Sequence, residues 1–357
     1  MSSIRLEYEI LVSGIYPFEG HFEKNGFTMV TNLFDVECIN SLVEKGVIYL
    51  NPLFGICCIN DSNGNSLYLT LRKSEQIEVD YPDGEEYSLK YTNQYLRSIN
   101  IWESVNFLEK SMVLEINNDI KFPVKMVKVY DMDNKLITIM ADIMKLNVPT
   151  LIGTNQERIS ETVKRQINRL SSGFSYNKLQ DLASNNVYFK NALSMYHASF
   201  SVSDHQVGFT LLVISLESML GLDTYGKPET CRECKQKKYK ITATISENVS
   251  YILKDQDDSI KRKMKNFYSM RSKYVHSGKF IEEAAEQELQ EYVRKVILMY
   301  WYTSMYRNTY DHKELMSYLR SDEYKVDAAT NTFLIALENK SFEERKRKIV
   351  ETMLLKK

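Results

Sequence analysis

Residues Ile4-Arg5-Leu6-Glu7-Tyr8-Glu9-Ile10 alternate apolar and charged side chains without a break. Successive side chains of an extended strand point to opposite faces, so this alternation gives one face to a core and the other to water. The stretch therefore predicts a half-buried β-strand near the start of the chain, within a β-rich domain.

The rest of residues 1–150 carries similar signals. This half holds five of the six prolines, and it contains turn sequences such as Asn60–Gly64 and Tyr81–Gly84. Short apolar or alternating segments predict five further strands, at Leu67–Arg72, Tyr87–Tyr91, Met112–Ile116, Val124–Tyr130 and Leu136–Met140. We expect a mainly antiparallel β domain over residues 1–150, built as a sandwich or a barrel.

The apolar period changes close to Pro149. Four apolar residues then recur at spacings of four, four and three, which places them on one face of a helix: Ile159, Val163, Ile167 and Leu170. Further helical patterns cover residues 185–200, 205–221, 258–277 and 283–308. The fold class predicted is α+β, with the N-terminal mainly antiparallel β domain followed by an all-α helical bundle over residues 151–357.

The charge is divided unevenly between the two halves. Residues 1–150 contain 13 Lys and Arg against 21 Asp and Glu, and the remaining residues contain 33 against 26. The first half is therefore acidic and the second basic. The second half is the better candidate for binding a polyanion.

Several classes of protein are disfavoured by what the chain lacks. Its start has no basic segment followed by an apolar run, and the apolar run at Phe209–Leu220 is too short to span a bilayer. Five cysteines with no regular spacing do not indicate a disulfide framework. We expect a soluble cytoplasmic protein with no membrane partner. Gly-rich phosphate loops, Gly-x-Ser-x-Gly and His-Glu-x-x-His are absent, which argues against nucleotide hydrolysis, α/β-hydrolase chemistry and zinc proteolysis.

The segment Arg271-Ser272-Lys273-Tyr274-Val275-His276 lies near the end of a predicted helix that stops at Gly278. Arg271 interrupts an otherwise apolar stripe on this helix, so it needs a partner. That partner could be Glu217, in a buried ion pair, or a phosphate received in a groove. The end of a helix favours the imidazolium form of His276. A guanidinium that binds phosphate and an imidazole that transfers protons are together suited to cutting a phosphodiester.

Residues 185–310 resemble a HEPN domain, specifically the Apea-like branch found in bacterial anti-phage proteins. The resemblance rests on Arg271 and His276 with four residues between them, on the preceding helix at Leu211–Leu220, and on the segment Tyr239–Leu253 between the two. At the position after the arginine, where the family often has Asn, Asp or His, this chain has Ser272.

The resemblance implies a metal-independent endoribonuclease that acts as a homodimer, with Arg and His of both protomers lining one cleft. His276 would carry out the general acid and base steps, and Arg271 would clamp the scissile phosphate. Glu217 and Ser272 are candidates to orient this pair, although a structural ion pair is the favoured role for Glu217. The products would be a 2′,3′-cyclic phosphate and a 5′-hydroxyl, and DNA would resist cleavage. The acidic N-terminal domain would sense a phage-derived trigger or restrain the nuclease.

Basic side chains close in sequence to the proposed cleft are candidates for contacts with the RNA backbone: Lys261, Arg262, Lys263, Lys265 and Lys273. They could equally mark a solvated face. The aromatic series Tyr300, Trp301, Tyr302 and Tyr306 could stack on bases, but its helical setting favours core or dimer packing. The other histidines, His21, His197, His205 and His312, show no local partner pattern and are expected to be surface or cap residues.

Cys231-Arg232-Glu233-Cys234 has the spacing that lets two thiolates reach one zinc ion. Two ligands do not complete a site, so a surface pair with no role is the favoured interpretation and redox sensitivity is a further alternative. Apart from this possible zinc, no cofactor is expected. Two alternatives to the nuclease remain. One is a non-catalytic HEPN dimer that binds RNA or a protein partner, and the other is a metal-dependent regulator built on Cys231 and Cys234.

Overall fold

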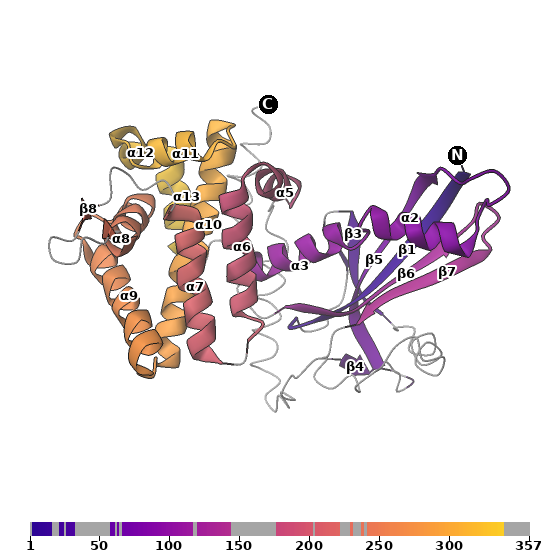
Figure 1. Cartoon of the computed structure of the whole chain (residues 1–357), viewed down its shortest axis with the longest axis horizontal. Coiled ribbons are helices and arrows are strands. Elements are labelled where there is room, and N and C mark those ends of the chain that lie inside the picture. The colour runs from indigo at the N-terminus through magenta and orange to yellow at the C-terminus, as the bar shows by residue number, and fades with distance from the viewer. Residues whose placement is uncertain are drawn as a thin grey trace. The chain divides into compact units, whose positions relative to one another are not determined.

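The computed structural model of the chain describes residues 2–15, 21–24, 26–32, 58–60, 63, 66–116, 120–143, 176–202, 204–221, 229–230, 237–238 and 241–338. Two compact units are present, shown in Figure 1. One comprises Met1–Met112 and Asn118–Ser171, and the other Val113–Asn117 and Ser172–Lys357. The domain boundary predicted near residue 150 and the helix predicted around Ile159–Leu170 both lie outside the described residues.

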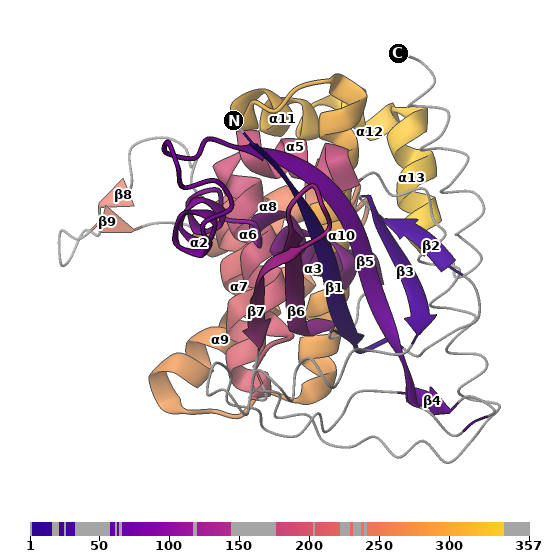
Figure 2. The same ribbon diagram turned by 90° about the vertical axis from the view of Figure 1, so that its right-hand side faces the viewer.

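The first unit is built on one antiparallel sheet of seven strands. In spatial order the main path runs β2 (His21–Lys24), β3 (Phe27–Asn32), β5 (Ser66–Val79), β1 (Ser2–Ser13), β6 (Lys121–Tyr130) and β7 (Leu136–Ile143), and β4 (Cys58–Asn60) also pairs with β5. The side-by-side order is visible in Figure 2. Among the described strands, β2 and β7 are the two ends of an open sheet, so these strands do not form the expected sandwich or barrel.

The alternation in β1 does what the sequence predicts. Ile4, Leu6, Tyr8 and Ile10 are buried, while the charged residues between them are half-exposed. Among the described residues, the other elements of this unit are helices: α2 (Leu89–Ser98) and α3 (Glu103–Ile116) as far as Met112. The Tyr8 ring meets the Trp102 ring edge to face at 6.5 Å, just before α3 begins.

Two predicted strands are wrong because they are helical. Tyr87–Tyr91 contains the start of α2, and Met112–Ile116 is the last part of α3. A short apolar run does not distinguish a strand from a buried helix. The signal that decides α3 is the spacing of Val105, Leu108 and Met112, which are all fully buried.

The second unit is a helical bundle, as predicted. Its helices are α5 (Tyr176–Asn185), α6 (Val187–Ser199), α7 (His205–Leu220), α8 (Ile241–Ile252), α9 (Ser259–Ser277), α10 (Glu283–Arg307), α11 (His312–Leu319), α12 (Asp322–Val326) and α13 (Ala328–Glu338). Two short paired strands, β8 (Glu229–Thr230) and β9 (Lys237–Lys238), precede α8. The four helical patterns predicted between residues 185 and 308 correspond to α6, α7, α9 and α10.

The long helix α10 passes through the middle of the bundle (Figure 1). Tyr300, Trp301 and Tyr302 on this helix are at most 1% exposed, so these aromatic side chains are core residues and are not available to stack on bases. Tyr302 stacks on Phe333 of α13 with ring centroids 4.0 Å apart. None of the described helices is long and apolar enough to cross a membrane.

Candidate functional site

Helix α9 carries both residues of the predicted Arg and His pair. The helix ends at Ser277, and Gly278 follows with φ of 64°, a left-handed conformation that glycine adopts without strain. The Gly278 N–H donates to the Tyr274 carbonyl at 2.8 Å. His276 therefore lies in the last helical turn, as its position before a glycine predicts.

Arg271 lies on the side of α9 that packs against α7. Its Nη1 donates to Glu217 Oε1 at 3.0 Å, which is the ion pair that the sequence left as one of two possibilities. The two side chains are 30% and 26% exposed, so the pair is shielded but still reached by solvent. The Arg271 Nε–H is buried and has no hydrogen-bond partner among the residues described. Burial raises the pKa of the neighbouring Tyr268 phenol, and the charge of Glu217 raises that pKa further.

His276 is exposed on a different face of the same helix. Five residues at about 100° each separate it from Arg271, so the two side chains leave the helix axis about 140° apart. No hydrogen bond or ion pair joins them in the described part of the chain. One protomer therefore does not bring the predicted pair together by itself.

The basic side chains of α9 fall into two groups. Lys261 pairs with Glu247 at 3.3 Å, and this hydrogen bond raises the pKa of the lysine. Lys263 pairs with Glu288 and lies 5.7 Å from the centre of the Tyr292 ring. Glu288 and Tyr292 both belong to α10. These two lysines are therefore already engaged within the bundle.

The side chains of Arg262, Lys265 and Lys273 are exposed, and no hydrogen bond or ion pair joins them to a described residue. The charge of Arg262 contributes to lowering the pKa of the nearby Asp257 carboxyl. At about 100° per residue, they share an arc of about 80° with His276. We call these four side chains the α9 stripe. The stripe places three exposed cations and one imidazole on the same solvent-facing side of the helix. Ser272 is also exposed.

Two of the remaining histidines have partners that sequence spacing did not reveal. His205, at the start of α7, bonds to Glu286 of α10. His312 is buried, contrary to expectation, and its Nδ1 lies 2.9 Å from the Tyr300 hydroxyl. Its ring also packs against Tyr188 at 4.2 Å between centroids. Sequence separation hides the pair with Glu286, which is 81 residues from His205.

Cys231 and Cys234 lie outside the described residues, between β8 and β9. Within the described ranges there is no group of three or more His, Cys, Asp or Glu side chains that could hold a metal ion. The structure therefore does not bear on zinc at the two cysteines.

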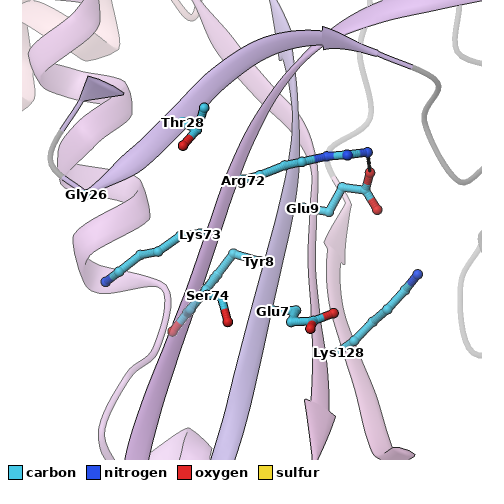
Figure 3. Close-up of a pocket in the computed structure, with 9 residues that line it drawn as sticks. All are labelled: Glu7, Tyr8, Glu9, Gly26, Thr28, Arg72, Lys73, Ser74 and Lys128. Atoms are coloured by element: carbon cyan, nitrogen blue, oxygen red, sulfur yellow. Dashed lines mark hydrogen bonds and ion pairs between the residues drawn. The ribbon is translucent and has the colours of Figure 1, made fainter. Parts of the chain in front are cut away.

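The sheet unit has a hollow of about 440 Å³ on β1, β3, β5 and β6, lined mainly by charged and hydroxyl side chains (Figure 3). Arg72 of β5 forms an ion pair with Glu9 of β1 at 2.6 Å, drawn as a dashed line in the figure. Lys73 pairs with Glu75, two residues further along the same strand. A cross-strand pair such as that of Arg72 with Glu9 stabilises the sheet. These contacts are explained by the sheet itself and do not indicate a particular ligand.

Comparison with known proteins adds no assignment. No protein-family model, no curated protein and no solved structure matches the chain.

Proposed function

We propose that the helical unit is a HEPN-type, metal-independent endoribonuclease, working as a homodimer in anti-phage defence. The observation that carries the proposal is the α9 stripe. Exposed cations on one helix face suit the phosphates of a single strand, because lysine and arginine bind the backbone without reading bases. An exposed imidazole at the end of that track could move protons at the bound phosphodiester.

In this proposal His276 removes the 2′-hydroxyl proton and protonates the leaving 5′ oxygen. Arg271 faces Glu217 on the other side of α9, so it does not reach the phosphate held by the stripe of its own protomer. A homodimer that aligns two α9 helices could supply the arginine from the partner, which is the arrangement implied by the resemblance. A phage-derived trigger would act through the sheet unit.

The first test is cleavage of a labelled RNA in EDTA by the wild-type chain, Arg271→Ala and His276→Ala. We expect a 2′,3′-cyclic phosphate and a 5′-hydroxyl from the wild type, and a loss of at least about 100-fold in rate for His276→Ala. RNA binding by His276→Ala should persist. Cleavage that continues undiminished in His276→Ala would refute the assignment.

The binding track has a matched control on the same helix. Replacing Arg262, Lys265 and Lys273 together by alanine should weaken RNA binding and reduce the salt dependence by about 0.7 per lost phosphate contact on a single strand. The control is Lys261→Ala with Lys263→Ala, because both lysines are held by carboxylates. We expect a smaller loss of affinity from the control. Equal losses would contradict the α9 stripe as the track.

A second candidate is a non-catalytic dimer that binds RNA. The separation of Arg271 and His276 onto different faces, together with the ion pair to Glu217, favours it. It predicts the same salt-dependent binding through the α9 stripe, but no cleavage under any activating condition.

A further inference from the structure

His205 and Glu286 connect the first turns of α7 and α10. The imidazole Nδ1 lies 2.7 Å from Glu286 Oε2, and its Nε2 lies 3.9 Å from Glu283 Oε2. The side chain of His205 is 51% exposed, whereas that of Glu286 is only 11% exposed. A half-exposed imidazole is thus hydrogen-bonded to a nearly buried carboxylate. Figure 1 shows the beginnings of α7 and α10 at the same end of the bundle.

Gly208 makes this contact possible. A Cβ atom at this position would lie 2.1 Å from Glu286 Oε1, a distance that side-chain atoms do not tolerate. The carboxylate therefore rests directly against the backbone of α7. An alanine at 208 would have to push the Glu286 carboxylate away from its present position.

The same turn of α7 also holds the connection between α9 and α10. The Gln206 side chain donates to the Ile281 carbonyl at 3.0 Å and accepts from the Ile281 N–H at 2.8 Å. Both hydrogen bonds are buried. Ile281 belongs to the short connection that follows His276 and Gly278. An interaction that stabilises the first turn of α7 therefore also stabilises the connection between α9 and α10.

We propose that His205, Glu286 and Gly208 form a proton-controlled clasp between α7 and α10, which fixes the α9–α10 connection when His205 is protonated. The charged groups that act on the ring are Glu286 and Glu283 of α10 and Asp204, the residue that caps α7. An imidazolium offsets this cluster of three carboxylates. A neutral imidazole leaves their mutual repulsion largely uncompensated.

The direction of the pH dependence follows from these contacts. The hydrogen bond to Glu286 raises the pKa of His205, and the charges of Glu283 and Asp204 add to this effect. Burial raises the pKa of Glu286, whereas its contact with His205 lowers that pKa. The contact between the two groups therefore tightens proton binding at His205 and favours the ionised form of Glu286. The contribution of His205 is therefore complete below the ordinary histidine pKa of about 6.5, and it is lost as pH rises through the value in the folded protein.

The Ile281 amide reports directly on the clasp, because its hydrogen exchange requires the bond to Gln206 to open. We would follow this exchange and the His205 titration by NMR from about pH 5.5 to 8.5, correcting for intrinsic exchange. Protection of Ile281 should fall by about tenfold per unit by which the pKa of His205 is raised. The Phe189 amide, held by the Asn186 cap at 2.9 Å, is the internal control and should not follow the His205 titration.

Gly208→Ala is the decisive variant, since it leaves every titratable group in place. We expect the pKa of His205 to return toward its ordinary value and the pH dependence at Ile281 to disappear. Glu286→Gln is the second variant, should the alanine prevent folding, and it predicts the same loss. An unchanged His205 titration in both variants, or Ile281 protection independent of pH in the wild type, would overturn the clasp.

The clasp itself does not depend on the proposed function. Only its relevance to RNA cleavage does, because the connection that it fixes follows His276. Neither measurement involves RNA, so failure of cleavage would not affect the clasp. Failure of the clasp would likewise not affect the nuclease assignment.

Discussion

The ion pair between Arg271 and Glu217 joins α9 to α7, and it also contains the arginine of the proposed nuclease site. The pair is about 30% exposed, so solvent screens part of its attraction. We expect Arg271→Met and Glu217→Gln each to lower the free energy of unfolding by about 1 kcal/mol, and the double-mutant cycle to give a coupling energy of about 0.5–1 kcal/mol. Chemical denaturation of the wild type, the two single variants and the double variant measures this coupling energy.

The control for this cycle is the ion pair of Arg307 and Glu323, in which Nη1 and Oε1 are 3.3 Å apart and both side chains are more exposed. Its coupling energy should be close to zero. If both cycles gave the same value, the shielding of Arg271 by α7 would have no energetic consequence. A coupling energy well above about 1 kcal/mol would instead indicate that the main role of the Arg271–Glu217 pair is to stabilise the fold.

At the scale of the element, the end of α9 sets the position of His276. A Cβ atom at Gly278 would meet nothing within 4 Å, so the only cost of Gly278→Ala is the left-handed backbone, about 1 kcal/mol. The helix should fray at its last turn, which carries His276, with a matching loss of thermal stability. Gly278→Asn is the control, because asparagine tolerates this conformation better than alanine does. Equal stability of the two variants would contradict the prediction that the left-handed backbone at position 278 is what destabilises the alanine variant.

At the scale of the whole molecule, the last turn of α3 is part of the helical unit although it precedes residue 150. Arg294 of α10 is 7% exposed and donates to the carbonyls of Leu114 and Glu115 at 2.9 and 3.0 Å. Val113–Asn117 accordingly belongs to the same compact unit as Ser172–Lys357. A fragment of residues 151–357 would lack both carbonyl acceptors of this guanidinium, and the loss of hydrogen bonds to a charged group costs roughly 1.5–3 kcal/mol. It should unfold at lower denaturant than the helical unit of the full chain.

Arg294→Met separates this cause from other effects of truncation. In the full chain it should destabilise by about 2–4 kcal/mol, because two helix-end carbonyls lose their donor. In the fragment the same change should be neutral or stabilising, since the charge is already unpaired there. Destabilisation of equal size in both proteins would contradict this account.

The sequence by itself determined which elements form where one period dominates. The alternation of Ile4–Ile10 specifies β1, and the helical spacing specifies α6, α7, α9 and α10, because each pattern matches only one backbone geometry over a long stretch. The glycine at 278 likewise marks the end of α9. Local patterns failed at Tyr87–Tyr91 and Met112–Ile116, where apolar runs were too short to carry a period.

Only the tertiary structure decided what the functional candidates touch. It directed Arg271 toward Glu217, separated engaged lysines from free ones on α9, buried His312 and joined His205 to Glu286. Two of these outcomes depend on helices whose contacting residues are far apart in the sequence, 54 positions for Arg271 with Glu217 and 81 for His205 with Glu286. Burial and charge pairing are properties of the assembled bundle, so no spacing along the chain encodes them.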